Sequence, residues 1–232
     1  LASHPVGQQA RQYLKLKRGV SEETIRLFKL GYAPPLWEGL QKFLVGKKGY
    51  KPEELLRAGL IVGQTGRFRD FFRDRLIFPL KDHRGNVVGF SGRILSGDGP
   101  KYINTPETLV YHKAELLYGL ETTKNAIKSQ NQVIIVEGEF DLLSSWQAGV
   151  LNVVAIKGSA LTESQLKLLK RFCENLVLAL DRDLAGDTAS HRGIELAELS
   201  GFNVQVFRLS ESKDPDELAR KNPEAWKEVV SS

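Results

Sequence analysis

The chain has 232 residues, of which 41% are apolar and 26% charged. It has no run of 18 apolar residues and no signal-peptide pattern, so no membrane span is expected. Its one cysteine, Cys173, excludes an internal disulfide and fits a reducing compartment, so we expect a cytoplasmic protein. Residues 1–130 hold 22 Lys and Arg against 12 Asp and Glu, whereas residues 131–232 hold 11 against 16.

This division of charge suits a polyanion bound by the first half and cations bound by the second. Two unrelated solvated surfaces would give the same counts, so charge alone does not choose between them. The four histidines show no metal spacing and there is no cysteine cluster, so no zinc site is expected. Since residue 1 is Leu and Met is absent, we expect a piece of a longer protein.

The first half predicts helices followed by a hairpin. Helices are expected at about 5–17, 21–29, 36–45 and 52–58, with Gly31 as a stop signal. Two apolar runs flank the turn residues 82–86, which is typical of a β-hairpin. The stretch from there to Gly119 is interpreted as a functional loop region. The polar run Lys124–Gln132 is interpreted as a joint between domains 1–125 and 126–232.

The second half alternates short apolar runs with helical patterns. Because the runs are continuously apolar, they predict strands of a parallel sheet covered by helices on both faces, an α/β fold. The strands are expected at about 132–136, 152–156, 176–180 and 203–208, and the helices at about 140–148, 163–172, 186–199 and after Asp214 and Asn222.

Acidic residues follow three of these strands. Glu137 follows the first, Asp181 and Asp183 follow the third, and Asp214 and Asp216 follow the last. Ligands of such sheets bind beyond the carboxyl ends of the strands. Carboxylates gathered there need a counter-charge, which hard divalent cations supply. The pattern predicts metal-assisted phosphoryl chemistry, although each acid could instead cap a turn or helix.

Three other polar features accompany this pattern. After the first of these strands, Glu139 is expected to face solvent and Asp141 to hold the turn. In the first half, Arg73 and Arg75 are candidates for phosphate contacts, because guanidinium groups bind phosphates bidentately. Solvated charges at a strand edge would explain the same two arginines.

The order of the motifs resembles a known family. Val-Glu137-Gly-Glu-Phe-Asp141, followed by Asp181-Arg-Asp183-Leu-Ala-Gly186, resembles the Toprim domain of primases, topoisomerases and some nucleases. In the first half, Arg75-Leu-Ile-Phe-Pro, Gly89-Phe-Ser-Gly-Arg93 and Pro100-Lys-Tyr-Ile-Asn-Thr-Pro-Glu-Thr resemble the catalytic core of bacterial DnaG-type DNA primase. The likeness covers nearly the whole chain.

This resemblance implies an α/β fold in which a parallel-sheet Toprim domain packs against a mixed α+β N-terminal subdomain. It implies that Glu137, Asp181 and Asp183 are catalytic and hold two or more Mg²⁺ or Mn²⁺ ions. Asp214 and Asp216 would complete the metal-binding cluster. The residues implied to bind nucleotide or template, together with Arg73 and Arg75, are Arg93, Lys101, Asn104 and Lys113.

The resemblance further implies an RNA polymerase that makes short RNA primers by metal-dependent nucleotidyl transfer. Its partners would be a single-stranded DNA template, ribonucleoside triphosphates and the RNA–DNA hybrid product. A replicative helicase would bind through regions missing from this chain, and no membrane is involved. Two alternatives stay open: a Toprim nuclease or topoisomerase fragment, and the N-terminal half of a primase-helicase that acts mainly as a single-stranded DNA-binding module.

Overall fold

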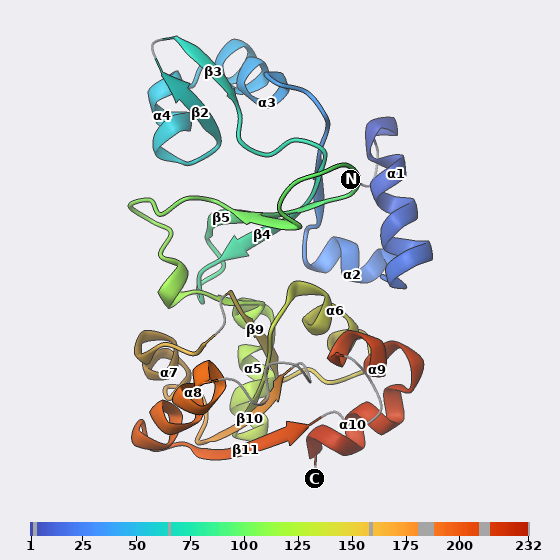
Figure 1. Ribbon diagram of the computed structural model, residues 1–232, viewed down its shortest axis with the longest axis vertical. Helices are drawn as coiled ribbons and strands as arrows, with labels where there is room; N and C mark the ends of the chain where they lie inside the picture. Colours follow the sequence, from blue (N-terminus) through green and yellow to red (C-terminus); the bar gives the residue numbers. More distant parts are fainter. Residues whose placement is uncertain (2–3, 65, 158–159, 181–187, 209–213, 232) are drawn as a thin grey trace. The chain divides into compact units, whose positions relative to one another are not determined.

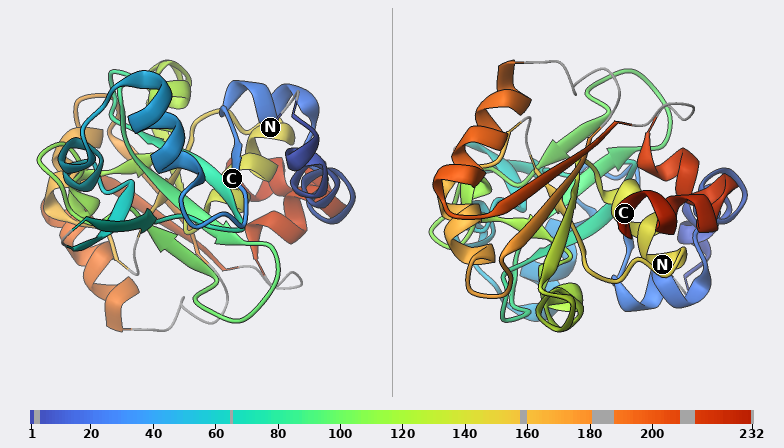
Figure 2. Two further views of the ribbon diagram at one scale, coloured as in Figure 1. Left: turned by 90° about the horizontal axis from the view of Figure 1, so that it is seen from above. Right: turned by 90° about the horizontal axis from the view of Figure 1, so that it is seen from below.

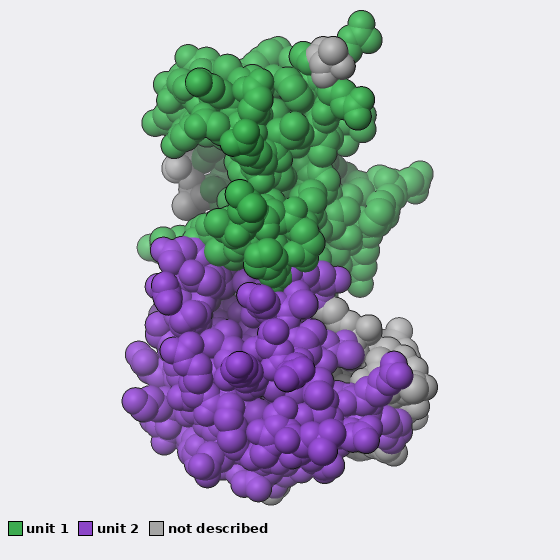
Figure 3. Space-filling view, turned by 90° about the vertical axis from the view of Figure 1, so that its left-hand side faces the viewer, with its two compact units in different colours: residues 1–18, 25–80, 87–112 green, residues 19–24, 81–86, 113–232 purple. Residues whose placement is uncertain are grey.

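The computed structural model describes residues 1, 4–64, 66–157, 160–180, 188–208 and 214–231. The chain divides into two compact units, coloured separately in Figure 3. Unit 1 comprises residues 1–18, 25–80 and 87–112, and unit 2 comprises residues 19–24, 81–86 and 113–232. Among the described residues, none of the helices is both long enough and apolar enough to cross a membrane. The predicted boundary at residue 125 stays a prediction.

The helices predicted for the first half are confirmed, with shorter bounds in places. The first is continuous from residue 5 to 17, although its hydrogen bonding changes along its length. Gly31, predicted as a helix stop, instead opens a strand, because residues 31–33 pair with residues 75–77. These elements are η1 (Pro5–Gly7), α1 (Gln8–Gln12), η2 (Tyr13–Lys17), α2 (Glu22–Leu27), β1 (Gly31–Ala33), α3 (Gly39–Lys42), η3 (Phe43–Lys47) and α4 (Pro52–Arg57).

Unit 1 contains a sheet of order β1-β4-β5-β6. The predicted hairpin is confirmed as β4 (Arg75–Lys81) and β5 (Val87–Ile94). Its turn closes as the Gly85 amide donates to the Asp82 carbonyl at 3.0 Å. The sequence reading missed β2 (Ile61–Gln64) and β3 (Arg67–Asp70), which form a separate antiparallel pair, and β6 (Tyr102–Asn104), which lies within the predicted loop region.

Unit 2 contains a sheet of order β11-β10-β8-β9-β7 among the described residues. The first four strands are parallel, as predicted, and the short β7 (Leu117–Tyr118) pairs antiparallel with β9 at the edge. The strands are β8 (Gln132–Val136), β9 (Val153–Ile156), β10 (Asn175–Leu180) and β11 (Asn203–Arg208). The helices are α5 (Leu120–Gln130), α6 (Glu139–Gln147), α7 (Glu163–Leu169), α8 (Thr188–Leu199), α9 (Pro215–Lys221) and α10 (Pro223–Ser231), and η4 (Lys113–Glu115) precedes β7.

Helices cover both faces of this sheet (Figures 1 and 2). Successive strand residues point to opposite faces, so Val133 and Ile135 join a core cluster with residues of α5, α7 and α8. On the other face, α6 contacts β9 and α9, and α9 contacts α10. The polar run interpreted as a joint is therefore mostly helix, because α5 buries Leu120 and Ile127 against the sheet.

Cys173 is buried in the same cluster, at 3% exposure. Burial raises the pKa of its thiol to about 11, although the nearby Lys170 charge opposes the shift. The thiolate is the nucleophile that attacks thiol reagents, so Cys173 of the folded chain should react slowly at pH 8. The labelling rate of this single cysteine therefore reports the opening of unit 2.

Replacing Ile127 with Ala should destabilise unit 2 by about 3 kcal/mol, because the Ile127 side chain is fully buried and its truncation leaves a cavity. Urea unfolding, followed in parallel by the labelling of Cys173, measures the loss. The matched control is Leu199→Ala, since Leu199 is 79% exposed and should change stability by less than about 0.5 kcal/mol. Equal stability of the two variants would contradict this account of the core.

Candidate active site

Glu137 lies directly after β8, at the carboxyl edge of the parallel sheet. Leu178 of β10 is in register with Ile135, and Ala155 of β9 is in register with Val136. Continuing these registers, Glu137 is level with Leu180, the last residue of β10. The structure thus puts a half-buried carboxylate where the three central strands end. Asp181 and Asp183, predicted to join it, lie outside the described residues.

The turn after Glu137 is closed by Asp141. Its Oδ2 accepts a hydrogen bond from the Gly138 amide at 2.9 Å, which caps the start of α6. A Cβ at position 138 would come within 2.9 Å of the same oxygen, so a larger residue there would require the Asp141 side chain to shift. The expectation that Asp141 holds this turn is confirmed.

A buried hydrogen-bond network joins this turn to α9. The Asp216 amide donates to Asp141 Oδ1 at 3.2 Å. The Asp216 carboxylate, only 1% exposed, accepts from Ser144 Oγ and, at 3.0 Å, from Arg220 Nε. Both donors go to Oδ1, and they offset part of the cost of burying this carboxylate. Asp216 therefore fixes α9 to α6.

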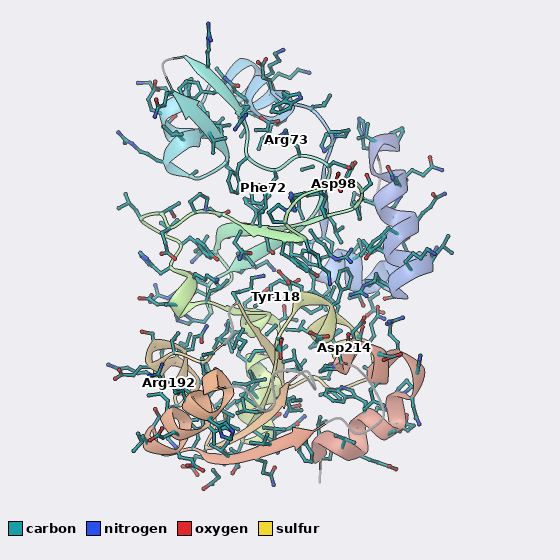
Figure 4. The ribbon with its side chains drawn as sticks, viewed as in Figure 1. Phe72, Arg73, Asp98, Tyr118, Arg192 and Asp214 are labelled. Carbon is teal, nitrogen blue, oxygen red and sulfur yellow. The ribbon has the colours of Figure 1, made fainter. Side chains whose placement is uncertain are left out.

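Asp214 caps the first turn of α9. Its Oδ1 accepts from the Glu217 amide at 2.8 Å, and Pro215 occupies the first helical position. Figure 4 labels Asp214 at this helix start. The capping role that the sequence left open for Asp214 is thus present, and its participation in a metal site stays a prediction.

Glu139 was expected to face solvent, and this is wrong. Its side chain is 3% exposed and forms an ion pair with Lys157, whose side chain is 6% exposed. Lys157 directly follows β9. The pattern of strands and helices could not reveal this pair, because the two residues come together only when β9 aligns beside β8 and the first turn of α6.

The described residues contain no group of three or more His, Cys, Asp or Glu side chains that could hold a metal. The predicted set is divided: Glu137, Asp214 and Asp216 are described, whereas two aspartates are not. The donor chemistry nevertheless fits a hard divalent cation, because Glu137 offers carboxylate oxygens at the sheet edge where β10 also ends. Asp216 Oδ1 is engaged by Ser144 and Arg220, and the participation of Asp216 in a metal site stays a prediction.

In unit 1, basic side chains gather around an exposed tryptophan. Trp37 is 60% exposed. The Arg73 and Arg69 guanidinium carbons lie 4.5 and 5.6 Å from its ring centroid, within the range of cation–π attraction. We call Trp37, Arg69 and Arg73 the Trp37 platform. Sequence reasoning missed Trp37, because only the fold brings it to arginines more than thirty residues away.

Asp70 holds the platform in place. Its two carboxylate oxygens accept from the Leu40 and Gln41 amides at 2.7 and 2.9 Å, which caps α3 from β3. The Asp70 amide also donates to the Trp37 carbonyl at 2.6 Å. Arg73 Nη1 donates to the Asp70 carbonyl. Figure 4 labels Arg73 on the segment between β3 and β4, beside the buried Phe72.

Arg75 is buried and takes part in the fold. Its Nη1 donates to the carbonyls of Gly92 and Pro100 at 3.0 Å each, which ties β4 to β5 and to the loop before β6. Burial, with a contribution from the Arg73 charge, lowers the pKa of Arg75 from its ordinary value. Between the two arginines, Asp74 adopts a left-handed conformation and accepts from the Tyr32 hydroxyl at 2.6 Å. Burial and this hydrogen bond raise the pKa of Tyr32.

The other predicted binding residues are spread over β5, β6 and the adjoining loops. Arg93 Nη1 donates to the Tyr13 hydroxyl, and its guanidinium lies over the rings of Tyr13 and Tyr102 at 4.9 and 5.8 Å. Lys101 is exposed just before β6, and Asn104 ends β6 with its Oδ1 buried. Lys113 is exposed in η4 of unit 2.

Unit 1 also contains an apolar cavity of about 630 Å³ between α3 and the sheet, bordered by side chains that include Leu40, Phe43 and Phe72. None of its lining residues is Lys or Arg. Phosphate contacts are therefore expected at the Trp37 platform and around Arg93 rather than in this cavity.

Comparison with known proteins decides the family. Residues 1–124 match the family described as DNA primase catalytic core, N-terminal domain, and residues 134–219 match the Toprim-like family. The chain belongs to the DnaG-type DNA primases. It is 44% identical to the DNA primase of Clostridium acetobutylicum over 97% of this chain, and 39% identical to that of Escherichia coli over 94%.

Solved primase structures share the fold. A DnaG primase catalytic domain bound to single-stranded DNA is 36% identical, has a TM-score of 0.87, and matches 99% of this chain and 73% of its own. The RNA polymerase domain of Mycobacterium tuberculosis primase is 32% identical, has a TM-score of 0.89, and matches 99% of this chain and 77% of its own. The mixed α/β architecture predicted from the sequence is confirmed.

The chain spans 37% of the length of the Clostridium primase and 38% of the Escherichia coli primase. Primer synthesis is the known role of this family, and primases with a Toprim-like domain generally use divalent metal ions. Because the chain spans only part of these primases, primer synthesis and the use of divalent ions are proposals for this chain.

Asp216→Asn should lower the stability of metal-free protein by about 2 kcal/mol, because it removes the charge that Arg220 faces in a buried network. Thermal or urea unfolding in chelator measures this loss. Asp214→Asn is the matched control, since Asn caps helices about as well as Asp, and its stability should change by less than about 0.5 kcal/mol. If Asp216→Asn destabilised the protein only when Mn²⁺ was present, the network would not be its main role.

Proposed function

We propose that this chain is the catalytic core of a DNA primase, a nucleotidyltransferase that synthesises short RNA primers on single-stranded DNA. The observation that carries the proposal is the family match over both halves of the chain, combined with a carboxylate at the end of the central strand β8. The basic residues of unit 1 supply contacts for polyanions, and the acidic residues of unit 2 supply ligands for cations.

In this proposal, Glu137, Asp181 and Asp183 hold Mg²⁺ or Mn²⁺, two or more ions in all, with Asp214 as a further candidate ligand. Bound divalent ions supply positive charge that stabilises the reacting phosphate and its leaving group. The chain's own contribution is rigidity: Gly138 and Asp141 close the turn after Glu137. Asp216, whose Oδ1 already accepts from Ser144 and Arg220, is a further candidate beside Asp214.

The basic residues have separate tasks in the proposal. At the Trp37 platform, the exposed indole offers a stacking face for a template base, and Arg69 and Arg73 offer charge for the DNA backbone. Arg93, Lys101, Asn104 and Lys113 contact nucleotide phosphates or the template. Arg75 acts mainly by holding the loop that carries Lys101, because its Nη1 is committed to the Gly92 and Pro100 carbonyls.

Glu137→Gln and Asp181→Ala should each reduce primer synthesis by about 10²-fold or more, because each removes a carboxylate ligand of the metal ions that stabilise the reacting phosphate. Incorporation of labelled ribonucleotides on single-stranded DNA, with Mg²⁺ or Mn²⁺, measures the effect, and unfolding curves check that each variant is folded. Full primer yield from either folded variant would overturn the assignment of that residue. Metal-dependent cleavage of DNA without ribonucleotide incorporation would favour a Toprim nuclease instead.

Arg73→Ala should weaken single-stranded DNA binding and reduce the salt dependence of the binding constant by about one unit of log–log slope, because one phosphate contact is lost. Fluorescence anisotropy titrations over a range of salt concentrations measure both quantities. Arg57→Ala is the control, since Arg57 is an exposed arginine of α4 outside the Trp37 platform. Equal slopes for the two variants would remove Arg73 from the template site.

A further inference from the structure

The Glu139–Lys157 ion pair has no role in the site described so far. Both side chains are almost fully buried, at 3% and 6% exposure, and they contact each other directly. One belongs to the first turn of α6 and the other follows β9. Burying two charges costs solvation free energy that an apolar pair of the same volume would not lose. The pair is therefore weakly explained by stability alone.

The position of the pair points to Glu137. Val136 of β8 is in register with Ala155 of β9, so Lys157 is level with Gly138, the residue after Glu137. Glu139 is two residues beyond Glu137 in the chain. The ion pair thus joins the end of β9 to the segment that immediately follows Glu137. β8 holds Glu137 from the N-terminal side, and the ion pair holds it from the C-terminal side.

Two restraints then act on the same short turn. Asp141 holds Gly138 through the amide hydrogen bond at 2.9 Å, and Lys157 holds Glu139 through the buried ion pair. Unlike apolar packing, a hydrogen-bonded ion pair is directional, so it restricts the orientation of the backbone that carries it. A metal ligand is effective when such neighbouring contacts fix its orientation in advance.

We propose that Lys157 is a positioning residue, which acts through Glu139 to orient Glu137 and thereby sets the affinity of the divalent-metal site. This inference rests on the proposed function, because it takes Glu137 to be a metal ligand. In this proposal, Lys157 is not itself a ligand of the metal or the nucleotide. It acts on the chain that presents the carboxylate.

The decisive variant replaces both partners at once, Glu139→Leu with Lys157→Met. A single replacement would leave one buried charge uncompensated and would destabilise unit 2. The double variant removes equal and opposite charges and fills the space with apolar side chains of similar volume. Its net charge is unchanged, so altered metal affinity reports geometry. The conservative control is Lys157→Arg, which keeps the charge and a hydrogen-bond donor for Glu139.

Mn²⁺ binding to metal-free protein, measured by electron paramagnetic resonance of the free ion, is the main readout, and thermal unfolding in chelator checks the fold. We expect the double variant to stay folded and to bind Mn²⁺ about tenfold more weakly, and Lys157→Arg to bind within about threefold of the unchanged protein. A folded double variant with unaltered Mn²⁺ affinity would refute the positioning role. So would a Lys157→Arg variant that binds as weakly as the double variant.

Glu137→Gln separates this inference from the function on which it rests. If Glu137→Gln leaves Mn²⁺ binding unchanged, Glu137 is not a metal ligand, and both the proposed metal site and the inference are lost. If Glu137→Gln abolishes tight Mn²⁺ binding while the double variant binds normally, the metal site stands and only the role of Lys157 is lost.

Discussion

The parallel pairing of β8 with β9 on one side and β10 on the other is the constraint on which the candidate site depends. Each strand is almost continuously apolar, so the sheet is stable only when helices cover both of its faces. That requirement places α5, α7 and α8 against one face and α6 against the other, with α9 and α10 packed beyond it. The strands then end at one edge, and Glu137 is presented there because β8 is central.

A sheet edge alone does not orient a carboxylate. The polar residues that surround the turn after Glu137 are buried and hydrogen-bonded to one another, which offsets the cost of burying them. Asp141 caps α6 and receives the Asp216 amide, and Asp216 in turn engages Ser144 and Arg220. Acidic residues that look alike in the sequence thus divide into one half-exposed carboxylate at the edge and others that stabilise its surroundings.

Unit 1 shows the same division among its arginines. Arg75 is buried and braces strands and a loop through two carbonyls, whereas Arg73 lies over an exposed indole. Asp74, the residue between them, adopts a left-handed conformation. A run of alternating basic residues therefore does not form one uniform basic patch. Part of it is structural, because Arg75 is committed to backbone carbonyls.

The sequence alone was enough to predict the parallel α/β sheet, the β4–β5 hairpin, the helices of the first half and the position of Glu137 after β8. These features depend on local periodicity, turn residues and strand ends, which are all visible along the chain. The sequence did not predict α5, because most of this helix lies in a polar run. It is helical because its few apolar residues pack on the sheet. The pairing of Glu139 with Lys157 and the contact of Trp37 with Arg73 became visible only in the folded chain, because they join residues distant in the sequence. A buried charge has no signature in the sequence until its partner is known.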